Sequence, residues 1–262
     1  MAWALMRAGF LRYSTYRQAT AAGAFTNTVF GVIKISVLLA AARSAGGTVA
    51  GYDAAALSTY TWVSQGLIAA VMMFSWMPIA ERVRTGDVAI DLARPIHPIT
   101  AWLAEDLGRA AQASLIRFAV PMVVGGLLFG LRAPTHPATV PLFLLSAVLA
   151  VVVSFGCRVL VNLVAFWLVD VRGVATLYLG FSNTLSGILV PVAFFPGWLR
   201  DIAYATPFPS MLQVPVDVAV ERVTGTAAVG AVGTQAAWAA AMLALAHWVL
   251  SRGTRRLVVQ GG

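Results

Sequence analysis

Charged residues are scarce in this chain of 262 residues. They make up 11% of it, against roughly a quarter in a typical soluble domain, whereas 60% of the residues are hydrophobic and the mean hydropathy is +0.82. A soluble fold of this size cannot keep so much apolar surface away from water. The composition therefore excludes a soluble enzyme, a disordered chain and a nucleic-acid-binding domain, and it predicts an all-α protein that crosses a membrane several times.

Motifs that carry chemistry are also missing. The sequence has no GxxxxGKS or GxxxxGKT phosphate loop, and no HExxH, CxxC or GxSxG motif. Cys157 is the only cysteine, so an intrachain disulfide is impossible. We expect no metal site, because the histidines are far apart in sequence (His97, His136 and His247). The neighbouring carboxylates Glu105 and Asp106 are expected to lie solvated at a helix start, and no catalysis is expected on this chain.

Six apolar segments are predicted to span the membrane, as one domain covering residues 1–262. They are 25–42, 57–77, 113–131, 140–169, 174–195 and 227–250. The fourth is longer than the hydrocarbon core requires, so it should tilt or protrude. Residues 1–23 are predicted to form a helix on the membrane surface, because Trp3, Met6, Phe10 and Tyr13 recur at helical spacing. The alternative is an N-terminus that is merely hydrophobic.

The arginines predict the orientation of these spans. With the N-terminus in the cytoplasm, the inner segments carry Arg7, Arg12, Arg17, Arg82, Arg84, Arg94, Arg109, Arg172, Arg252, Arg255 and Arg256, and the outer ones carry Arg43, Arg132, Arg200 and Arg222. Positive residues concentrate on the cytoplasmic side of membrane proteins. We therefore expect both termini in the cytoplasm.

The predicted cytoplasmic loop, residues 79–112, contains a candidate docking helix. Gly86 should end a first helix, Asp87 can begin the next one, and Pro95 should stop it. Asp87 and Asp91 are four residues apart and are expected to share a face. A merely solvated loop would not need so many apolar residues. We expect contacts with a cytosolic partner from Arg84, Gly86, Asp87, Val88, Ile90, Asp91, Leu92 and Arg94.

Residues 186–226 are predicted to fold back into the outer leaflet. Gly187 and Pro191 interrupt the fifth apolar segment, and prolines and aromatic residues follow it too densely for one straight helix. Non-helical backbone at membrane depth must be buried in protein or line a cavity. The alternative is an ordinary exposed loop. The expected outer gate consists of Gly187, Pro191, Phe195, Pro196 and Trp198.

Three basic residues fall inside the predicted spans. Lys34 lies near the middle of the first span, and its charge should face the bundle, a subunit interface or a water-filled path. Arg117 and Arg158 lie closer to a membrane boundary and are expected to extend their charged ends towards water.

The chain resembles the ABC-2 permeases of ATP-binding-cassette exporters, in particular small permeases that are not fused to an ATPase. The resemblance covers essentially the whole chain and is carried by residues 30–34, 60–62, 84–95, 194–199, 207–210 and 255–262. It implies six spans with an N-terminal interfacial helix, a cytoplasmic coupling helix after the second span, and short re-entrant helices before the sixth.

The resemblance also implies a function. The chain would be the permease subunit of an exporter in the cell membrane, moving an amphiphilic substrate such as a drug, an antibiotic or a lipid. A cytosolic ATPase dimer would supply the power, so ATP and Mg would bind that partner and no cofactor would bind this chain. A second permease, either different or another copy, would complete the path. Candidate path residues are Asn27, Phe30, Lys34, Trp62, Gln65, Phe74 and Asn183.

Two other functions remain open from the sequence. An ion-coupled secondary transporter would need carboxylates inside the spans as proton carriers, and we expect none deep in a span. A membrane scaffold or a channel subunit would not need a docking helix for an ATPase. Co-purification with a cytosolic ATPase would separate these functions.

Overall fold

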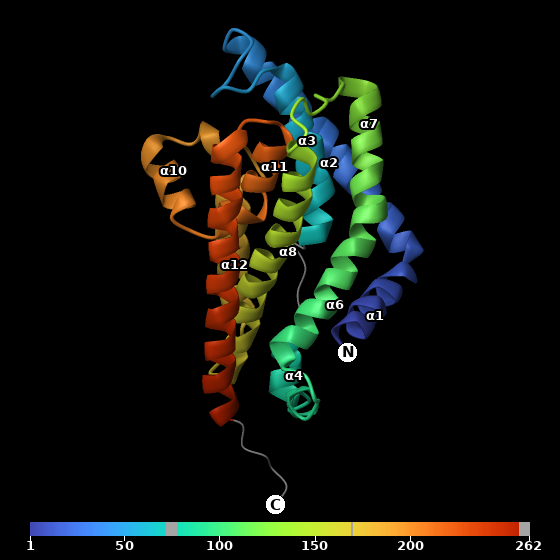
Figure 1. The fold of residues 1–262 in the computed structure, drawn as a ribbon, viewed down its shortest axis with the longest axis vertical. Helices are drawn as coiled ribbons and strands as arrows, with labels where there is room; N and C mark the ends of the chain where they lie inside the picture. Colours follow the sequence, from blue (N-terminus) through green and yellow to red (C-terminus); the bar gives the residue numbers. More distant parts are fainter. Residues whose placement is uncertain (72–77, 169, 257–262) are drawn as a thin grey trace, which may run out of the picture.

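The computed structural model describes residues 1–71, 78–168 and 170–256, which form an elongated bundle of helices (Figure 1). The bundle is built from α2 (Arg17–Ser44), α3 (Ala54–Val71), α6 (Pro98–Ala113), α7 (Ala119–Phe129), α8 (Thr139–Leu163), α9 (Arg172–Leu185) and α12 (Gly225–Gly253). Shorter elements are α1 (Ala2–Ser14), α4 (Ile79–Thr85), α5 (Val88–Leu92), α10 (Gly197–Tyr204), α11 (Gln213–Ala219), the π-helical turn η1 (Ser114–Phe118), and the 3-10 turns η2 (Val164–Phe166), η3 (Val192–Phe194), η4 (Phe208–Met211) and η5 (Thr254–Arg256).

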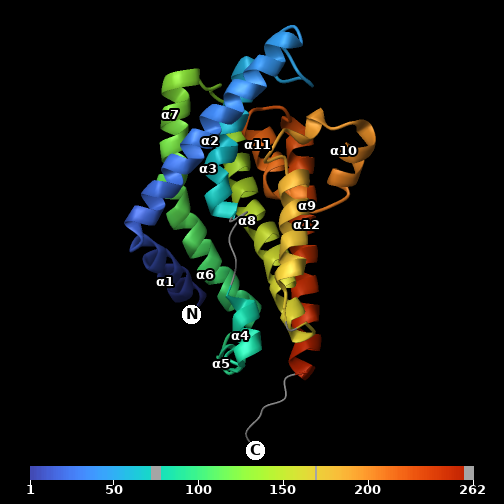
Figure 2. The ribbon, with the colours of Figure 1, turned by 180° about the vertical axis from the view of Figure 1, so that it is seen from behind.

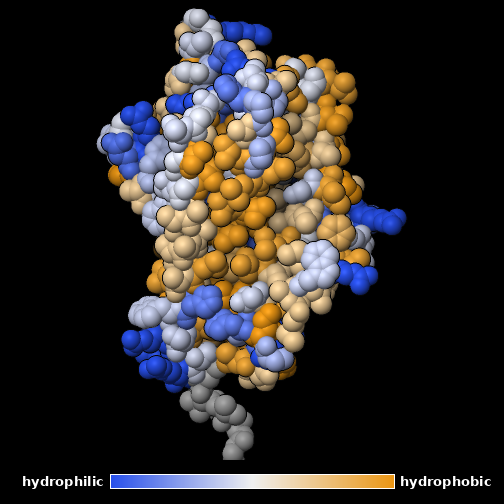
Figure 3. All heavy atoms as spheres, viewed as in Figure 1, coloured by the Kyte–Doolittle hydropathy of each residue, from blue (hydrophilic) through white to orange (hydrophobic). Residues whose placement is uncertain are grey.

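The molecule is built to cross a membrane more than once. Four helical stretches are long and apolar enough to span it, namely Arg17–Ser44, Pro98–Phe129, Thr139–Phe166 and Gly225–Arg256. On the face shown in Figure 3, hydrophobic side chains cover much of the middle, and hydrophilic ones gather mainly towards the two ends. Such an apolar surface is stable in hydrocarbon and would be costly in water.

The six-span count stays a prediction. The described part of the second predicted span is α3, with 18 residues, and the fifth corresponds to α9, with 14 residues. At 1.5 Å per residue these helices are about 27 Å and about 21 Å long, against a hydrocarbon core of about 30 Å. The end of the second predicted span, residues 72–77, lies outside the described residues.

The N-terminal helix packs on the bundle through glycines. A Cβ atom on Gly9 of α1 would lie 2.2 Å from the Glu105 carbonyl oxygen, and one on Gly108 of α6 would lie 1.9 Å from the Met6 carbonyl oxygen. The two backbones therefore cross in close contact (Figure 2). The predicted surface helix over residues 1–23 is shorter than expected, because α1 ends at Ser14 and α2 already begins at Arg17.

Half of the predicted cytoplasmic loop is part of a long helix. Residues 98–112 belong to α6, which continues through η1 into α7 as one helix up to Phe129. Its face towards α1, α3 and α8 is apolar apart from a few charged residues that pair within the protein. Sequence alone placed these charged residues in solvent.

The core is centred on α3, which is buried along nearly its whole length. Trp62 is fully buried, and its indole lies against Gly31 of α2 and Gly125 of α7. A Cβ atom on Gly125 would lie 2.2 Å from the ring, so only glycine leaves room for it. A second apolar cluster, which includes Val88, Trp102 and Phe155, joins α5 to α6 and α8.

A carboxylate between α11 and α12 holds the N-terminal end of α8. Glu221 accepts hydrogen bonds from the backbone N–H groups of Thr135 (2.9 Å) and His136 (2.8 Å) and from the Thr139 hydroxyl (2.6 Å). The hydroxyls of Thr135 and Thr139, followed by the backbone donors, lower the pKa of Glu221 from 4.5 to about 2. The ionised form is therefore the one that stabilises this end of the bundle.

Replacing Glu221 by Gln should make the stability of this end independent of acid. A carboxylate with a lowered pKa stabilises the fold above about pH 4.5, and this contribution disappears as the pH falls towards about 2. We expect the wild type to unfold at a higher temperature than Glu221→Gln at pH 7, with the gap closing between these two pH values. Thermal unfolding of the purified protein in detergent measures this.

Asp201→Asn is the matched control, because it neutralises an exposed carboxylate on α10. It should shift the unfolding temperature little. A gap between wild type and Glu221→Gln that stays constant down to about pH 2 would contradict the role of the charge.

Candidate functional site

The helices α4 and α5 form a bend at one end of the bundle. Gly86 adopts a left-handed conformation (φ +85°), which ends α4 and lets the chain turn into α5. Val88 is fully buried and anchors α5 to the core, while Ile90 on the opposite side is 59% exposed. Leu92, Asp87 and Arg94 are exposed as well. A short, anchored helix with an apolar, charged outer face is suited to docking against another protein.

Asp91 belongs to the inside of this bend. It is 2% exposed, and it pairs with Arg82 (2.7 Å) and Arg94 (3.4 Å) and accepts a hydrogen bond from the Trp102 indole (3.3 Å). The expectation that Asp87 and Asp91 share a face is therefore wrong. Asp87 precedes the helix instead of lying in it, so helical spacing does not apply to the pair.

A buried cluster of charges lies where α6 and α8 meet. Asp106 accepts hydrogen bonds from Arg109 Nε (2.7 Å) and from an Arg158 terminal nitrogen (2.7 Å), and all three side chains are buried. Asp106 is thus not a solvated residue at a helix start, and Arg158 does not extend to water. The single carboxylate is thus hydrogen-bonded to both guanidinium groups, and no charge of this cluster is buried without a partner.

The same cluster also binds the last described turn of α3. Arg109 donates hydrogen bonds to the carbonyl oxygens of Ala69 (2.8 Å) and Ala70 (2.7 Å). The Ser154 hydroxyl of α8 donates to the carbonyl oxygen of Val71 (2.6 Å). These bonds tie the last described turn of α3 to α6 and α8. The three helices are therefore fixed together at this point.

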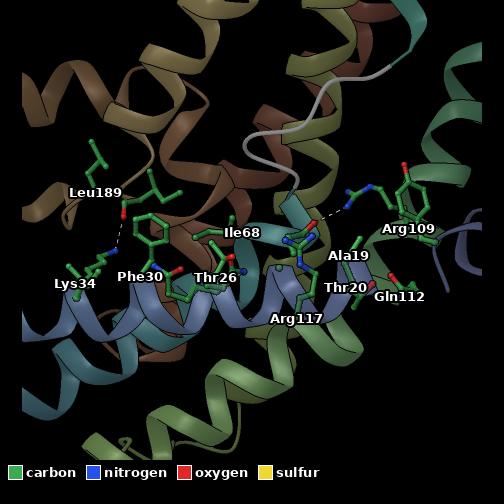
Figure 4. Close-up of a pocket in the computed structure, with 18 of the residues that line it drawn as sticks. Ala19, Thr20, Thr26, Phe30, Lys34, Ile68, Arg109, Gln112, Arg117 and Leu189 are labelled. Carbon is green, nitrogen blue, oxygen red and sulfur yellow. Dashed lines mark hydrogen bonds between the residues drawn. The ribbon is translucent and has the colours of Figure 1, made fainter. Parts of the chain in front are cut away.

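A pocket of about 990 Å³ opens along α2. Its walls come from α1, α2, α3, α6, η1 and the segment 188–190 that follows α9. Figure 4 shows Thr26, Phe30 and Lys34 along α2, with Arg117 and Arg109 towards one end. Four of the predicted path residues, Asn27, Phe30, Lys34 and Gln65, line this pocket.

Lys34 joins the pocket to the interruption of the fifth predicted span. Its amine donates to the carbonyl oxygen of Ile188 (2.8 Å), lies 3.4 Å from the Ser64 hydroxyl, and faces the Tyr60 ring at 5.0 Å (Figure 4). The charge is therefore held inside the bundle. Its desolvation is offset by a carbonyl that the broken helix leaves without a partner.

The other backbone groups of the interruption are satisfied in the same way. α9 ends at Leu185, and Gly187 takes a left-handed conformation (φ +88°). The Gly187 carbonyl accepts from the Tyr60 hydroxyl (2.7 Å), while the Gln213 side-chain oxygen accepts from the Val192 N–H (2.9 Å). A Cβ atom on Gly187 would lie 2.5 Å from that Gln213 oxygen, so the position requires glycine.

The comparison with protein families identifies the chain. The family model described as "ABC-2 family transporter protein" matches residues 26–261. The chain belongs to this family. It is therefore the transmembrane permease subunit of an ABC transporter. Permeases of this family are generally non-catalytic and normally work with a cytosolic ATPase. No curated protein and no solved structure matched the permease.

Two of the predicted path residues, Trp62 and Asn183, do not line the pocket. Trp62 is a core residue of the permease, fully buried between α2 and α7. Asn183 lies on α9 and its side-chain oxygen is buried without a hydrogen-bond partner among the described residues. Phe74 lies outside the described residues.

The predicted gate residues have different surroundings. Gly187 and Pro191 are buried in the interruption, and Phe195 packs against a small cluster that includes Ala203 of α10. Pro196 is exposed and precedes α10. Trp198 is 67% exposed on the outer side of α10, so it does not face the pocket.

Sequence reasoning missed Tyr60, Gln213 and Arg109, whose side chains form hydrogen bonds with backbone groups of α3 and of the interruption. Each is a polar residue within or beside an apolar segment, and that pattern could have marked them. Their backbone partners are 21 to 127 residues away in sequence, which no local pattern reveals. Arg117, which was expected to reach water, lines the pocket instead.

Replacing Lys34 by Met should destabilise the permease. The Ile188 carbonyl would lose its amine donor inside the bundle, at a cost of about 1–3 kcal/mol in the free energy of unfolding. Lys34→Arg retains a donor and should lose less. Thermal unfolding of the purified permease in detergent measures both variants.

Ser36→Ala is a suitable control, because the Ser36 hydroxyl is exposed and bonds only to its own helix. It should behave like the wild type. If Lys34→Met unfolds at the same temperature as Ser36→Ala, the amine does not hold the interruption.

Proposed function

We propose that the permease exports an amphiphilic substrate across the cell membrane, driven by ATP hydrolysis on a separate ATPase dimer. The observation that carries this proposal is the pocket along α2, which combines apolar side chains such as Phe30 and Ile33 with polar ones such as Asn27 and Gln65. A pocket of mixed character at a membrane-spanning helix suits a molecule with both polar and apolar parts. Its volume is within the range of small-molecule sites.

The ATPase would dock on the outer face of the α4–α5 bend. The surface consists of the exposed side chains of Arg84, Asp87, Ile90, Leu92 and Arg94. The buried side chains of Val88 and Asp91 anchor the bend and would transmit force to the core instead of touching the partner. Closure of the ATPases on ATP would move the bend as a rigid lever.

The arrangement of the ends agrees with the proposed orientation. α1, the α4–α5 bend and the end of α12 lie towards one end of the bundle, and α10, α11 and the turn between α2 and α3 lie towards the other (Figure 1). We place the first end in the cytoplasm, because it carries most of the arginines. The proposed second permease would face the exposed apolar side of α2, which carries Phe25, Ile33 and Val37.

Asp106 bears on the competing function, a proton-coupled transporter. It is a buried carboxylate on a membrane-crossing helix, a position that the sequence did not suggest. Its two oxygens accept hydrogen bonds from Arg109 and Arg158, and these two positive charges stabilise the ionised carboxylate and oppose the addition of a proton. This geometry favours a structural role for Asp106 and the ATP-driven function for the permease.

Replacing Ile90 by Asp tests the docking surface. The substitution places a charge on an exposed apolar contact without entering the core, so it should weaken ATPase binding while leaving the fold intact. We expect about tenfold less ABC-type ATPase to co-purify with the tagged permease from its own cells. Quantitative mass spectrometry of the purified complex measures this.

Thr224→Asp is the control, because it adds the same charge at an exposed position directly before α12, away from the α4–α5 bend. It should leave ATPase recovery unchanged. Equal recovery of the ATPase with both variants would argue against docking at α5. If no ABC-type ATPase co-purifies with the wild-type permease, the proposed function is overturned.

Cysteine labelling tests whether α10 dips into the outer leaflet. In a Cys157→Ser background, cysteines at Trp198 and Ile202 would be exposed on the protein, so only lipid could shield them. A cysteine at exposed Thr224 should react quickly with a membrane-impermeant thiol reagent. We expect the two α10 positions to react at least about tenfold more slowly in membranes, and as quickly as Thr224 in detergent-free unfolded protein.

Met211 and Leu212 are unsuitable for this purpose, since both are fully buried in the protein core. Their protection would say nothing about the bilayer. Rapid labelling at Trp198 and Ile202 in membranes would show that α10 lies in water.

A further inference from the structure

The charge of the pocket along α2 is one-sided. Its lining contains four basic residues, Arg12, Lys34, Arg109 and Arg117, and the residues described as lining it include no aspartate or glutamate. Positive charges gathered without counter-charges create a potential that attracts anions, more strongly where low-dielectric walls surround them. The pocket is therefore electrostatically suited to a negative group.

Two of these four charges already have partners. Lys34 binds the Ile188 carbonyl, and Arg109 binds Asp106 and the end of α3. Arg117 differs, because it forms no hydrogen bond or ion pair with any part of the chain that the structure describes, and its Nε atom is buried without an acceptor. A desolvated guanidinium nitrogen without an acceptor is costly, and an anionic ligand would remove that cost.

The backbone holds Arg117 at this place. Arg117 lies in the π-helical turn η1, an irregularity that is often associated with functional sites. Its guanidinium lies over Gly23 of α2, where a Cβ atom would be 2.2 Å from a terminal nitrogen. The positive charge of Arg109 also acts on Arg117 and disfavours its charged form. An anion bound at Arg117 would offset this repulsion.

Apolar side chains continue from this charged end. Phe30, Ile33 and Val37 of α2 and Leu189 after the interruption line the pocket and are each more than half exposed. Figure 4 places Arg117 towards one end of the row and Leu189 towards the other. Lys34 lies at this second end too, but its amine is bound to the Ile188 carbonyl. The order of the groups, an unpaired cation followed by a largely apolar wall, matches an acidic head group followed by a hydrocarbon tail.

We propose that this pocket binds an amphiphile with an anionic head group, a phosphate, sulfate or carboxylate, that pairs with Arg117 while the tail lies against Phe30, Ile33 and Leu189. The proposal rests on the proposed function for its role in transport, since it narrows the amphiphilic substrate to an acidic one. Binding itself does not require the ATPase, so it can be tested on the permease alone.

The first experiment compares head groups that carry the same tail. Purified permease in nanodiscs of phosphatidylcholine is titrated with dodecyl phosphate, with dodecyltrimethylammonium and with inorganic phosphate, using intrinsic tryptophan fluorescence or isothermal calorimetry. We expect dodecyl phosphate to bind at least about tenfold more tightly than either of the other two. Equal binding of the cationic amphiphile would overturn the proposal, because the pocket would then not distinguish a negative head group from a positive one.

The second experiment locates the site. Arg117→Gln should weaken dodecyl phosphate binding about tenfold, and Arg117→Lys should weaken it less. Gly23→Val keeps every charge but displaces the guanidinium, so it should resemble Arg117→Gln. Arg7→Gln removes a charge from exposed α1 outside the pocket and should bind as the wild type does. Wild-type affinity in both Arg117→Gln and Gly23→Val would overturn the proposal.

Two further measurements distinguish a bilayer lipid from a single-chain amphiphile as the source of the acidic group, and binding at this site from the proposed export. If nanodiscs containing phosphatidylglycerol compete with dodecyl phosphate, the occupant is a bilayer lipid; if they do not, it is a single-chain amphiphile, and either result supports the acidic site. Dodecyl phosphate that binds through Arg117 without changing the ATPase rate of the complete transporter would support the site and contradict the export function.

Discussion

The permease depends on finding hydrogen-bond partners for backbone groups that no water can reach. Two places in the bundle show this, the last described turn of α3 and the interruption after α9. Arg109 binds the carbonyls at the first place, and Lys34 binds a carbonyl at the second. A long basic side chain offers several donors on a flexible stem, so it can reach a carbonyl that helical geometry has released. The charged side chains of Arg109 and Lys34 thus supply hydrogen bonds to backbone carbonyl oxygens, and these bonds offset the cost of removing the charges from water.

The two places are connected through α3. Its lower end is fixed to α6 and α8 by Arg109, Asp106 and Ser154. Further along α3, Tyr60 binds the Gly187 carbonyl and the Gln213 side chain of α11, and Gln213 in turn donates to Tyr52, which donates to Asp217. In the proposed function, α3 would link the cytoplasmic side of the bundle to the outer segment, because a helix that is held at both ends transmits displacement.

Several of these features could be predicted from local sequence, and others could not. The apolar spans, the helix end at Gly86 and the interruption at Gly187 follow from composition and from backbone preferences, which depend on neighbours in sequence. The burial of Asp106 could not be predicted, because it is decided by Arg158, which is 52 residues away. The expectation that Asp87 and Asp91 share a helix face was wrong for a different reason. The helix α5 begins one residue after Asp87, so the spacing of four residues does not place the two carboxylates on one face.

Within one helix, the pairing of the charged residues distinguishes those that stabilise the fold from the one that we propose binds a ligand. Asp106, Arg109 and Arg117 all lie on the continuous helix from Pro98 to Phe129. The first two are fully engaged with the protein, and replacing either would leave a charge or a carbonyl without its partner inside the bundle. Arg117 satisfies nothing in the described chain, yet Gly23 leaves room for its guanidinium and a π turn directs it into the pocket. A charge that is positioned at such cost without stabilising the fold is best explained by a ligand that it meets, and this is why Arg117, and not the better-paired Lys34, marks the binding end of the pocket.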